Sequence, residues 1–215
     1  MALSDTITGY FLPNFLDAVR RELPHLTIRM TELHRPEIED RIASGEFDLA
    51  IALTSNVRRQ DLQCIPLIVS PRRLWVADNH RLAHRDTVSV SELQDEPYFL
   101  LQTDDHEDTM RRNWDSHGFT PNIVLRTFSI EGVRSLIAGG HGIGILSDTV
   151  YRPWSLEGKR ILRKPLQETF SSMDTGIILR QNMTPSPSLQ RLIQLAHRQV
   201  QNNDVYPSQI YLGDP

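Results

Sequence analysis

The sequence contains a single cysteine, Cys64, among its 215 residues, which excludes a disulfide bond within the chain. It lacks any run of about 20 apolar residues, the length that a transmembrane helix requires. No stretch combines a basic start with a short apolar segment in the manner of a secretory signal peptide. These absences lead us to expect a soluble cytoplasmic protein without a membrane partner.

An excess of positive charge is missing as well. The 23 Lys and Arg residues are outnumbered by 27 Asp and Glu residues, which gives a formal net charge of −4. A domain that holds nucleic acid directly carries a basic footprint, so we do not expect this chain alone to bind DNA. Hydrophobic residues at 39% and charged residues at 23% indicate a globular protein of one domain or two small ones.

The sequence also lacks the common motifs of catalysis and metal binding. It has no Gly-x-Ser-x-Gly, His-Glu-x-x-His or Cys-x-x-Cys. His80 and His84 are four residues apart, but no third ligand is near them. The acidic run from Asp104 to Asp108 favours a solvated helix start, because negative charge complements the helix dipole there. We therefore expect neither an enzyme nor a bound metal or cofactor.

Four glycines between residues 139 and 144 superficially resemble a phosphate loop. They run from a predicted helix into a predicted strand, the reverse of the order that presents N–H groups to a phosphate. We interpret them as helix termination and tight packing.

The first stretch of the chain predicts a buried strand that turns directly into an amphipathic helix. Apolar residues from Leu12 to Leu23 recur with the spacing of one helical face, and Pro13 suits an early helical position. Ser4, Asp5, Thr6 and Thr8 lie at the turn, beside the unpaired N–H groups of a helix start. Such a corner either binds an anion or caps itself.

The pattern of strand, turn and helix then recurs through an α/β chain. The first set of predicted elements comprises a strand at 26–30, a loop at 31–36, a helix at 36–44 ended by Gly45, and a buried strand at 47–53. The second set comprises strands at 98–102, 123–128 and 143–146 and helices at 103–117 and 130–138. The remaining elements are an edge strand at 161–166, a strand at 175–180 and a final helix from Ser186-Pro187, before a tail at 201–215 without an assignable pattern. We place two crossings between lobes, near residues 69–73 and 170–175.

Five phrases occur in an order that resembles the effector-binding domain of LysR-type transcriptional regulators, over roughly residues 2–200. The phrases are Phe11-Leu-Pro13, Gly45-Glu-Phe-Asp-Leu-Ala-Ile51, Asn79-His-Arg-Leu-Ala83, the run from Ser129 to Ile145, and Ser186-Pro-Ser-Leu189. The resemblance implies two Rossmann-like lobes joined by two crossing strands, as in type 2 periplasmic solute-binding proteins. Lobe I would comprise residues 1–70 and 172–215, and lobe II residues 71–171.

The resemblance also implies a function. A small effector would bind between the lobes and change their relative orientation. Family members carry an N-terminal winged helix-turn-helix that this chain lacks, so DNA would be bound only through that missing domain. The family further implies a homodimer or homotetramer, in which the first helix of one subunit lies near the helix at 130–138 of another.

In open α/β sheets, ligands bind at the carboxyl ends of the strands. The residues at those ends are our candidate ligand-binding residues: Asp5, Thr6, Ile7, His34, Arg35 and Thr54 in the first lobe, and Gln102, Thr103, Phe128 and Ser129 in the second. Thr6 matches a pocket Ser or Thr of the family, and Arg35 follows the second strand in a loop that commonly faces the effector. Hydroxyls and an arginine suit a carboxylate, so we predict a small organic acid, with Phe128 and Ile7 against its apolar part.

Alternative interpretations remain open at this point. Thr6 and Ser129 can simply cap helices, Arg35 can be a solvated loop charge, and His34 can be a surface residue. A periplasmic solute-binding protein for transport would share the fold. An enzyme could use the same cleft, although that would need a buried acid and base that the sequence does not show.

Overall fold

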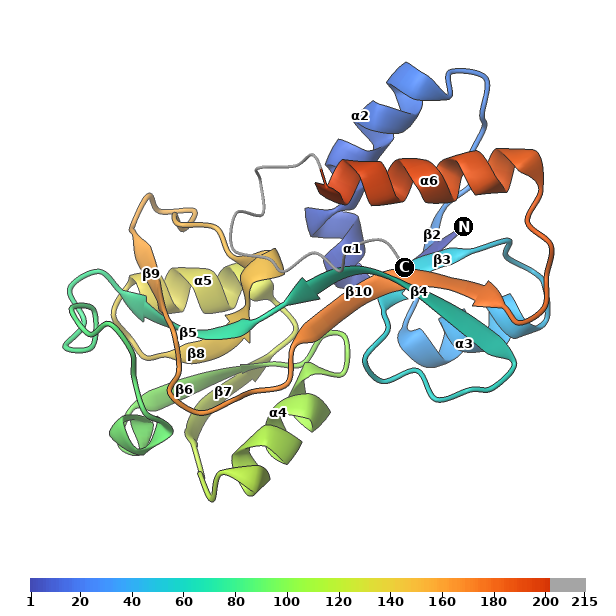
Figure 1. Cartoon of the computed structure of the whole chain (residues 1–215). Helices are drawn as coiled ribbons and strands as arrows, with labels where there is room; N and C mark the ends of the chain where they lie inside the picture. Colours follow the sequence, from blue (N-terminus) through green and yellow to red (C-terminus); the bar gives the residue numbers. More distant parts are fainter. Residues whose placement is uncertain (202–215) are drawn as a thin grey trace. The chain divides into compact units, whose positions relative to one another are not determined.

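The computed structural model describes residues 1–201, so the tail from Asn202 to Pro215 lies outside the described residues. The chain forms two compact units (Figure 1). Unit 1 comprises Met1–Ser70 and the chain from Met173 onward, and unit 2 comprises Pro71–Ser172. The chain therefore leaves unit 1 after Ser70 and returns to it at Met173.

Unit 1 is built on one five-stranded sheet with the order β2-β1-β3-β10-β4. Its strands are β1 (Ala2–Leu3), β2 (Thr31–Glu32), β3 (Ala50–Leu53), β4 (Leu62–Ser70) and β10 (Met173–Arg180). Its helices are α1 (Asp5–Tyr10), α2 (Leu12–Glu22), α3 (Arg35–Ala43) and α6 (Pro187–Gln201). β1 is parallel to β2 and β3, whereas β10 runs antiparallel to β3 and β4. This is the parallel α/β unit that the sequence predicted, closed by a strand from the far end of the chain.

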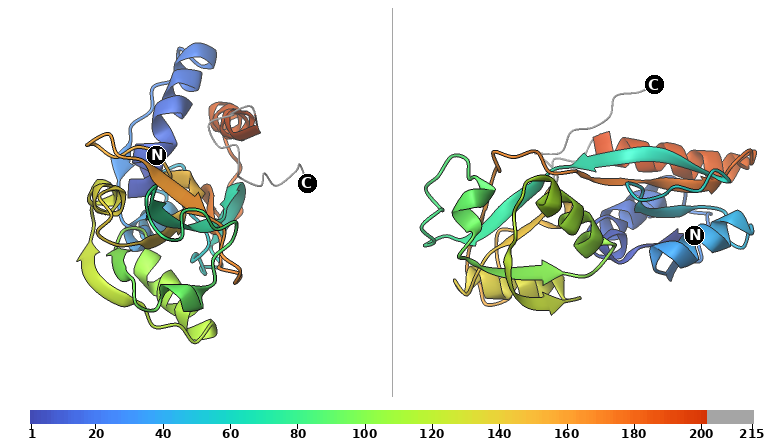
Figure 2. Two further views of the ribbon diagram at one scale, coloured as in Figure 1. Left: turned by 90° about the vertical axis from the view of Figure 1, so that its left-hand side faces the viewer. Right: turned by 90° about the horizontal axis from the view of Figure 1, so that it is seen from below.

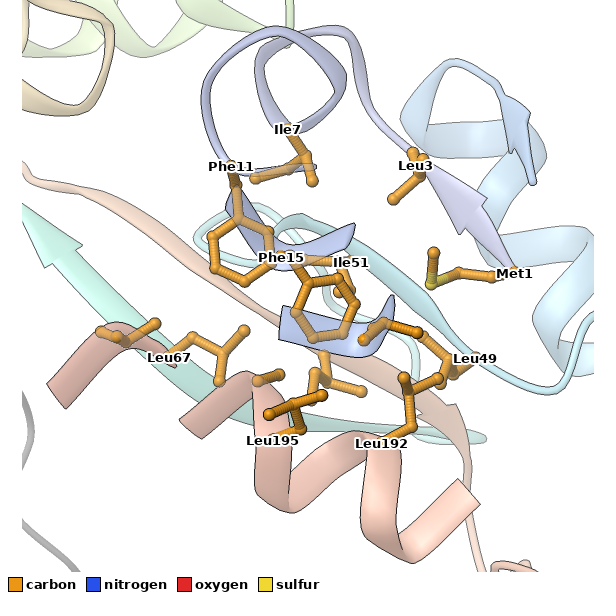
Figure 3. Close-up of a cluster of buried hydrophobic side chains, with 14 of the residues drawn as sticks. Met1, Leu3, Ile7, Phe11, Phe15, Leu49, Ile51, Leu67, Leu192 and Leu195 are labelled. Atoms are coloured by element: carbon orange, nitrogen blue, oxygen red, sulfur yellow. The ribbon is translucent and has the colours of Figure 1, made fainter. Parts of the chain in front are cut away.

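A cluster of buried side chains fills the space between this sheet and the pair α2 and α6. Figures 1 and 2 both show these two helices side by side. Phe15 has no exposed surface and stacks on Phe11, with ring centroids 5.3 Å apart. Figure 3 shows the two rings in one cluster with Ile51 of the sheet and Leu195 of α6. On the opposite face of the sheet, α3 buries Ile38 and Ile42 completely.

Two expectations for the start of unit 1 need correction. The expected turn at Ser4–Thr8 is a short helix, α1, because Ser4 and Ile7 already accept hydrogen bonds from the N–H groups of Thr8 and Phe11. The expected strand at 26–30 is wrong: only Thr31 and Glu32 pair with β1, because β1 itself has two residues. The predicted helix Leu12–Leu23 is confirmed as α2, with Pro13 in its first turn.

Unit 2 contains a three-stranded and a two-stranded sheet. Its strands are β5 (Arg72–Ala77), β6 (Pro97–Leu101), β7 (Asn122–Thr127), β8 (Gly144–Ser147) and β9 (Ile161–Lys164), and its helices are α4 (His106–Ser116), α5 (Ile130–Ala138) and the 3₁₀ turns η1 (Val90–Leu93) and η2 (Asp148–Val150). The orders are β8-β5-β9, all antiparallel, and β6-β7, parallel. A bridge between Tyr98 and Ile143 links the two sheets. The predicted helix at 130–138 is confirmed as α5 to the residue.

The helix predicted at 103–117 starts later than expected. Asp104 and Asp105 have φ values of 51° and 56°, a left-handed conformation that cannot continue into a right-handed helix. α4 therefore begins at His106, and only Glu107 and Asp108 supply negative charge to its first turn. The acidic run is thus divided between a left-handed turn and a helix start.

The glycines after α5 serve helix termination and packing, as the sequence predicted. Gly140 has a φ of 78° just beyond the end of the helix. A Cβ on Gly142 would lie 2.4 Å from the carbonyl oxygen of Pro97, closer than real side chains come to backbone. Gly142 therefore allows the chain to approach β6 where the Tyr98–Ile143 bridge forms.

A single added methyl group should affect stability differently at two glycines. We expect Gly142→Ala to lower the free energy of unfolding by about 1–3 kcal/mol, since the Pro97 carbonyl would have to move. Gly9→Ala in α1 meets no atom within 4 Å and should leave stability unchanged or raise it by up to about 1 kcal/mol. Urea unfolding of both variants measures the difference, and equal effects would contradict the packing role of Gly142.

Candidate functional site

The carboxyl ends of the three parallel strands of unit 1 meet at one edge of its sheet. Ser4 follows β1 and donates its N–H to the carbonyl of Ile51 at 3.3 Å. Leu33 follows β2 and donates its N–H to the carbonyl of Leu3 at 2.9 Å. The starts of α1 and α3 and the end of β3 therefore share this edge, which we call the unit 1 edge: Ser4, Asp5, Thr6, His34, Arg35 and Thr54.

Ser4 is the residue at this edge that the predicted site did not include. It occupies the N-cap position of α1 with an extended backbone, yet its side chain makes no capping hydrogen bond. Ser4 is 2% exposed, and its hydroxyl oxygen has no hydrogen-bond partner among residues 1–201. A buried hydroxyl without a partner costs free energy. The position of Ser4 after a buried strand was visible in the sequence, but its missing partner was not.

The other residues of α1 divide between the surface and the core. Thr6 is 5% exposed and is the second residue of the helix, so it is not the helix cap that the sequence allowed as an alternative. Asp5 is exposed at the helix start. Ile7 has no exposed surface and belongs to the core cluster (Figure 3). The core already covers the Ile7 side chain, and its predicted contact with a ligand stays a prediction.

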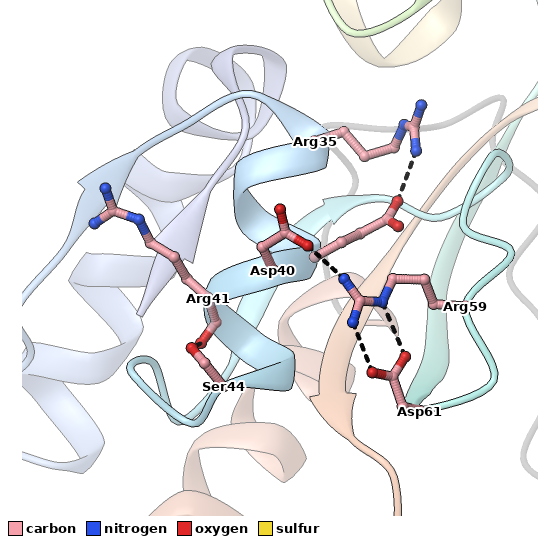
Figure 4. A network of polar contacts seen from close by, with 7 residues as sticks. Arg35, Asp40, Arg41, Ser44, Arg59 and Asp61 are labelled. Carbon is pink, nitrogen blue, oxygen red and sulfur yellow. Dashed lines mark hydrogen bonds and ion pairs between the residues drawn. The ribbon is translucent and has the colours of Figure 1, made fainter.

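Arg35 is the first residue of α3, where the sequence predicted a loop. Its Nη1 lies 2.7 Å from Oε1 of Glu39 one turn further on, and Glu39 is 7% exposed (Figure 4). Carboxylate and guanidinium hold each other in place, so Arg35 is not a freely solvated charge. His34 precedes it as an exposed N-cap that makes no side-chain cap. Figure 4 also shows Arg59 bridging Asp40 and Asp61 away from this edge.

Thr54 completes the unit 1 edge directly after β3. Its N–H donates to the carbonyl of Asp174 at 2.8 Å, and its hydroxyl donates to the same oxygen at 3.3 Å. The hydroxyl proton is thereby directed at the backbone, while the lone pairs of the oxygen can still accept a hydrogen bond. Thr54 is therefore better suited to a donor group of a ligand than to a carboxylate.

In unit 2, the corresponding edge follows β6 and β7. We call it the unit 2 edge, and it comprises Gln102, Thr103, Phe128 and Ser129. The N–H of Gln102 donates to the carbonyl of Thr127 at 2.9 Å, which places the two strand ends together. The side-chain amide of Gln102 donates to Glu107 at 2.7 Å. This hydrogen bond lowers the pKa of Glu107, and the nearby Arg126 guanidinium lowers it further.

Ser129 and Phe128 have different roles at this edge. The hydroxyl of Ser129 accepts a hydrogen bond from the N–H of Gly132 at 2.9 Å, which confirms the interpretation of Ser129 as the cap of α5. Phe128 is 70% exposed. Single exposed apolar side chains are common on protein surfaces, so the predicted contact of Phe128 with the apolar part of a ligand stays a prediction.

Two buried basic residues of unit 2 were not predicted from the sequence. Arg72 is 8% exposed, and its Nη1 donates to the carbonyl of Ser172 at 2.7 Å. His106 is 7% exposed, and burial, together with the Arg72 charge, lowers its pKa to about 3. The His106 imidazole is therefore neutral at physiological pH. No local pattern distinguishes a buried Arg or His from an exposed one.

Groups of His, Cys, Asp and Glu that could hold a metal ion do not occur within residues 1–201. His80 pairs with Glu96 at 3.3 Å. Over the same range, no helix is both long and apolar enough to cross a membrane.

The LysR substrate binding domain family model matches residues 1–201. The regulator CysB of Burkholderia cenocepacia is 22% identical over 198 residues, which are 91% of this chain and 62% of CysB. The regulatory domain of Synechocystis CcmR, solved with 2-PG, has a TM-score of 0.79 at 20% identity and covers 94% of this chain and 96% of that one. The effector-binding domain of QuiR, solved with shikimate, has a TM-score of 0.73 at 18% identity and covers 94% and 95%.

The fold of both units and the family match point to the same family. The chain belongs to the LysR substrate-binding domain family, the effector-binding domains of LysR-type regulators with a type 2 periplasmic-binding-protein-like fold. It spans 62% of the length of CysB, and its curated relatives are transcriptional regulators.

Two serines at helix starts should respond differently to loss of the hydroxyl. We expect Ser129→Ala to lower the free energy of unfolding by about 0.5–2 kcal/mol, because it removes the cap on Gly132. Ser4→Ala should leave stability unchanged or raise it, since the Ser4 hydroxyl has no partner within residues 1–201. Thermal and urea unfolding test this, and a large loss in Ser4→Ala would show that Ser4 has a structural role instead.

Proposed function

We propose that this chain is the effector-sensing domain of a cytoplasmic LysR-type regulator, that its effector is a small organic acid, and that it has no enzymatic activity. The observation that carries the proposal is the buried hydroxyl of Ser4, which has no partner within residues 1–201 at the edge where the parallel strands end. A ligand that reaches this edge would supply the missing hydrogen-bond partner.

The chemistry of the unit 1 edge supports an anionic ligand. Ser4 and Thr6 bring hydroxyls, and Arg35 brings a guanidinium held by Glu39. Hydrogen bonds from a guanidinium to a carboxylate are among the strong ones in proteins. Shikimate in the QuiR complex is a carboxylic acid, and 2-PG in the CcmR complex is another small molecule. We therefore assign the carboxylate to Ser4, Thr6 and Arg35, with His34, Asp5 and Thr54 nearby.

Residues of unit 2 complete the proposed recognition. Gln102, Thr103 and Ser129 offer polar groups for the remainder of the effector, and Phe128 offers an exposed ring for its apolar part. An effector that contacts residues of both units shifts the equilibrium between two arrangements only by the difference in its affinity for them. We propose that this shift reaches DNA through a winged helix-turn-helix domain outside this chain.

Arg35 provides the direct test of the carboxylate assignment. We first identify a ligand by thermal shift with a panel that includes shikimate and other small organic acids, then measure its Kd by calorimetry. Arg35→Ala should weaken binding about tenfold or more, because it removes charged hydrogen bonds. Arg41→Ala, on the same helix and paired with Glu46, is the matched control and should leave the Kd unchanged. An unchanged Kd in Arg35→Ala, or equal binding of all acids, would refute the assignment.

We further propose a homodimer or homotetramer in which α2 of one subunit, the helix that the sequence predicted at Leu12–Leu23, lies near α5 of another. The strand β7 supports this, because Val124 is 53% and Leu125 36% exposed beside α5. Val124→Asp should therefore weaken association at least tenfold in sedimentation experiments. Leu156→Asp, at a residue 78% exposed in the turn before β9, is the control and should not. A monomer at high concentration in the unchanged chain would contradict the proposal.

A further inference from the structure

A short hairpin of unit 2 presents two large apolar side chains to solvent. The hairpin spans residues 153–161, and Trp154 bridges Arg160 across its two arms. Figure 1 shows it as the loop that leads into β9. Trp154 is 56% exposed and Leu156 is 78% exposed. Tryptophan is highly buried on average in folded proteins, so an exposed tryptophan beside an exposed leucine is an unusual feature of this surface.

Hydrogen bonds within the hairpin fix the direction of these side chains. The N–H of Ser155 donates to the carbonyl of Lys159 at 2.9 Å. Ser155 is 8% exposed, and its hydroxyl accepts hydrogen bonds from the N–H groups of Glu157 at 3.2 Å and Lys159 at 3.3 Å. Because Ser155 is held inward, its neighbours Trp154 and Leu156 are held outward. A surface that is fixed in this way loses little conformational entropy when it binds a partner.

The same region carries an excess of positive charge. Residues 149–166 contain five Lys or Arg residues and one acidic residue, Glu157, in a chain whose formal net charge is −4. Arg163 is already paired with the buried carboxylate of Asp148 at 3.0 Å. Lys159 and Arg160 are exposed on the hairpin itself, and they form no ion pair among residues 1–201. Their charges are therefore available to an anionic partner.

We propose that the 153–161 hairpin is a docking site for an acidic segment of another protein, in which apolar side chains alternate with carboxylates. The carboxylates would pair with Lys159 and Arg160, and the apolar side chains would cover Trp154 and Leu156. Tryptophan and arginine are enriched among the residues that dominate binding at protein interfaces, and complementary charge selects the partner. None of these residues belongs to the unit 1 edge or the unit 2 edge, so docking at the hairpin is separate from effector binding.

The distribution of charge favours a protein segment over DNA as the partner. Charges are screened beyond about 8 Å at physiological ionic strength, so a segment that lies on the hairpin is attracted mainly by Lys159 and Arg160. A DNA duplex is wider than this length and would also approach the acidic surface of the chain, in which 27 Asp and Glu outnumber 23 Lys and Arg. Phosphates are bound by charged and polar groups, so they would leave the apolar surface of Leu156 uncovered.

Tryptophan fluorescence reports on this hairpin. Trp75 has no exposed surface and Trp114 is 5% exposed, so acrylamide quenching of the unchanged chain measures the accessibility of Trp154. The probe is a synthetic peptide of Glu-Glu-Leu repeats, compared with a peptide of Gln-Gln-Leu repeats of the same length. We expect the acidic peptide to reduce the quenching and to bind with a Kd that rises with salt concentration. The uncharged peptide should bind at least tenfold more weakly.

Variants of the hairpin test its two kinds of contact in calorimetry with the acidic peptide. Lys159→Gln combined with Arg160→Gln should weaken binding at least fivefold, because it removes two exposed ion pairs. Arg111→Gln combined with Arg112→Gln is the matched control, an adjacent exposed pair on α4 with the same change in charge, and should leave the Kd unchanged. Trp154→Ala should weaken binding at least tenfold, although every charge is kept.

Equal losses of affinity in the two charge variants would overturn the proposal, as would equal binding of the two peptides or no binding of the acidic one. A DNA duplex of random sequence, or vesicles of phosphatidylserine and phosphatidylcholine, that protected Trp154 more strongly than the peptide would show a different class of partner and would overturn it as well. Quenching of Trp154 that falls as the protein concentration rises, without peptide, would show that a second copy covers the hairpin, with the same consequence.

Discussion

The antiparallel pairing of β10 with β3 and β4 is the interaction on which the rest of unit 1 depends. β10 lies inside the sheet, between strands that precede it by more than 100 residues, and the helix that follows it covers the core. Without β10, β3 and β4 would present open edges. Without α6, which follows β10, the core cluster around Phe15 would lose the side chain of Leu195. Non-local contacts of this kind require closure of a long loop before they stabilise anything. The sheet of unit 1 therefore cannot form completely without β10, which follows all the residues of unit 2 in the sequence.

Both units use parallel strands to collect polar residues at one edge, but the edges have different chemistry. The unit 1 edge holds hydroxyls and a guanidinium whose charge Glu39 partly balances. In unit 2, the carboxylate of Glu107 accepts hydrogen bonds from the side chains of both Gln102 and Arg126. A network that already satisfies its own members is rigid, and it offers a ligand less than a group without a partner does. This difference is the reason why we assign the carboxylate of the proposed effector to the unit 1 edge.

The parts of this fold that local patterns determine could be predicted from the sequence. The bounds of α5 follow from Ser129 at its start and glycine after its end, and the buried positions Ile38 and Ile42 follow from helical spacing. The ends of strands are harder to predict, because the length of a strand depends on its partner. β2 has two residues because β1, with which it pairs, has two. The burial of Arg72 and His106 depends on elements distant in the sequence. The same holds for the site: the strand-to-helix corner was recognisable, but the coverage of Ile7 and the unpaired Ser4 were not.

Ser4 and Ser129 show why residue type alone cannot separate a structural position from a binding one. Both follow a strand and precede a helix, and both suit an N-cap. Ser129 satisfies the helix, so its hydroxyl contributes to stability. The Ser4 hydroxyl is buried but does not cap its helix, so it lowers the free energy of unfolding of the unliganded chain by about 1–3 kcal/mol. That cost would be recovered when a ligand oxygen meets the hydroxyl, and the recovered free energy would then favour whichever arrangement of the chain brings the ligand to Ser4.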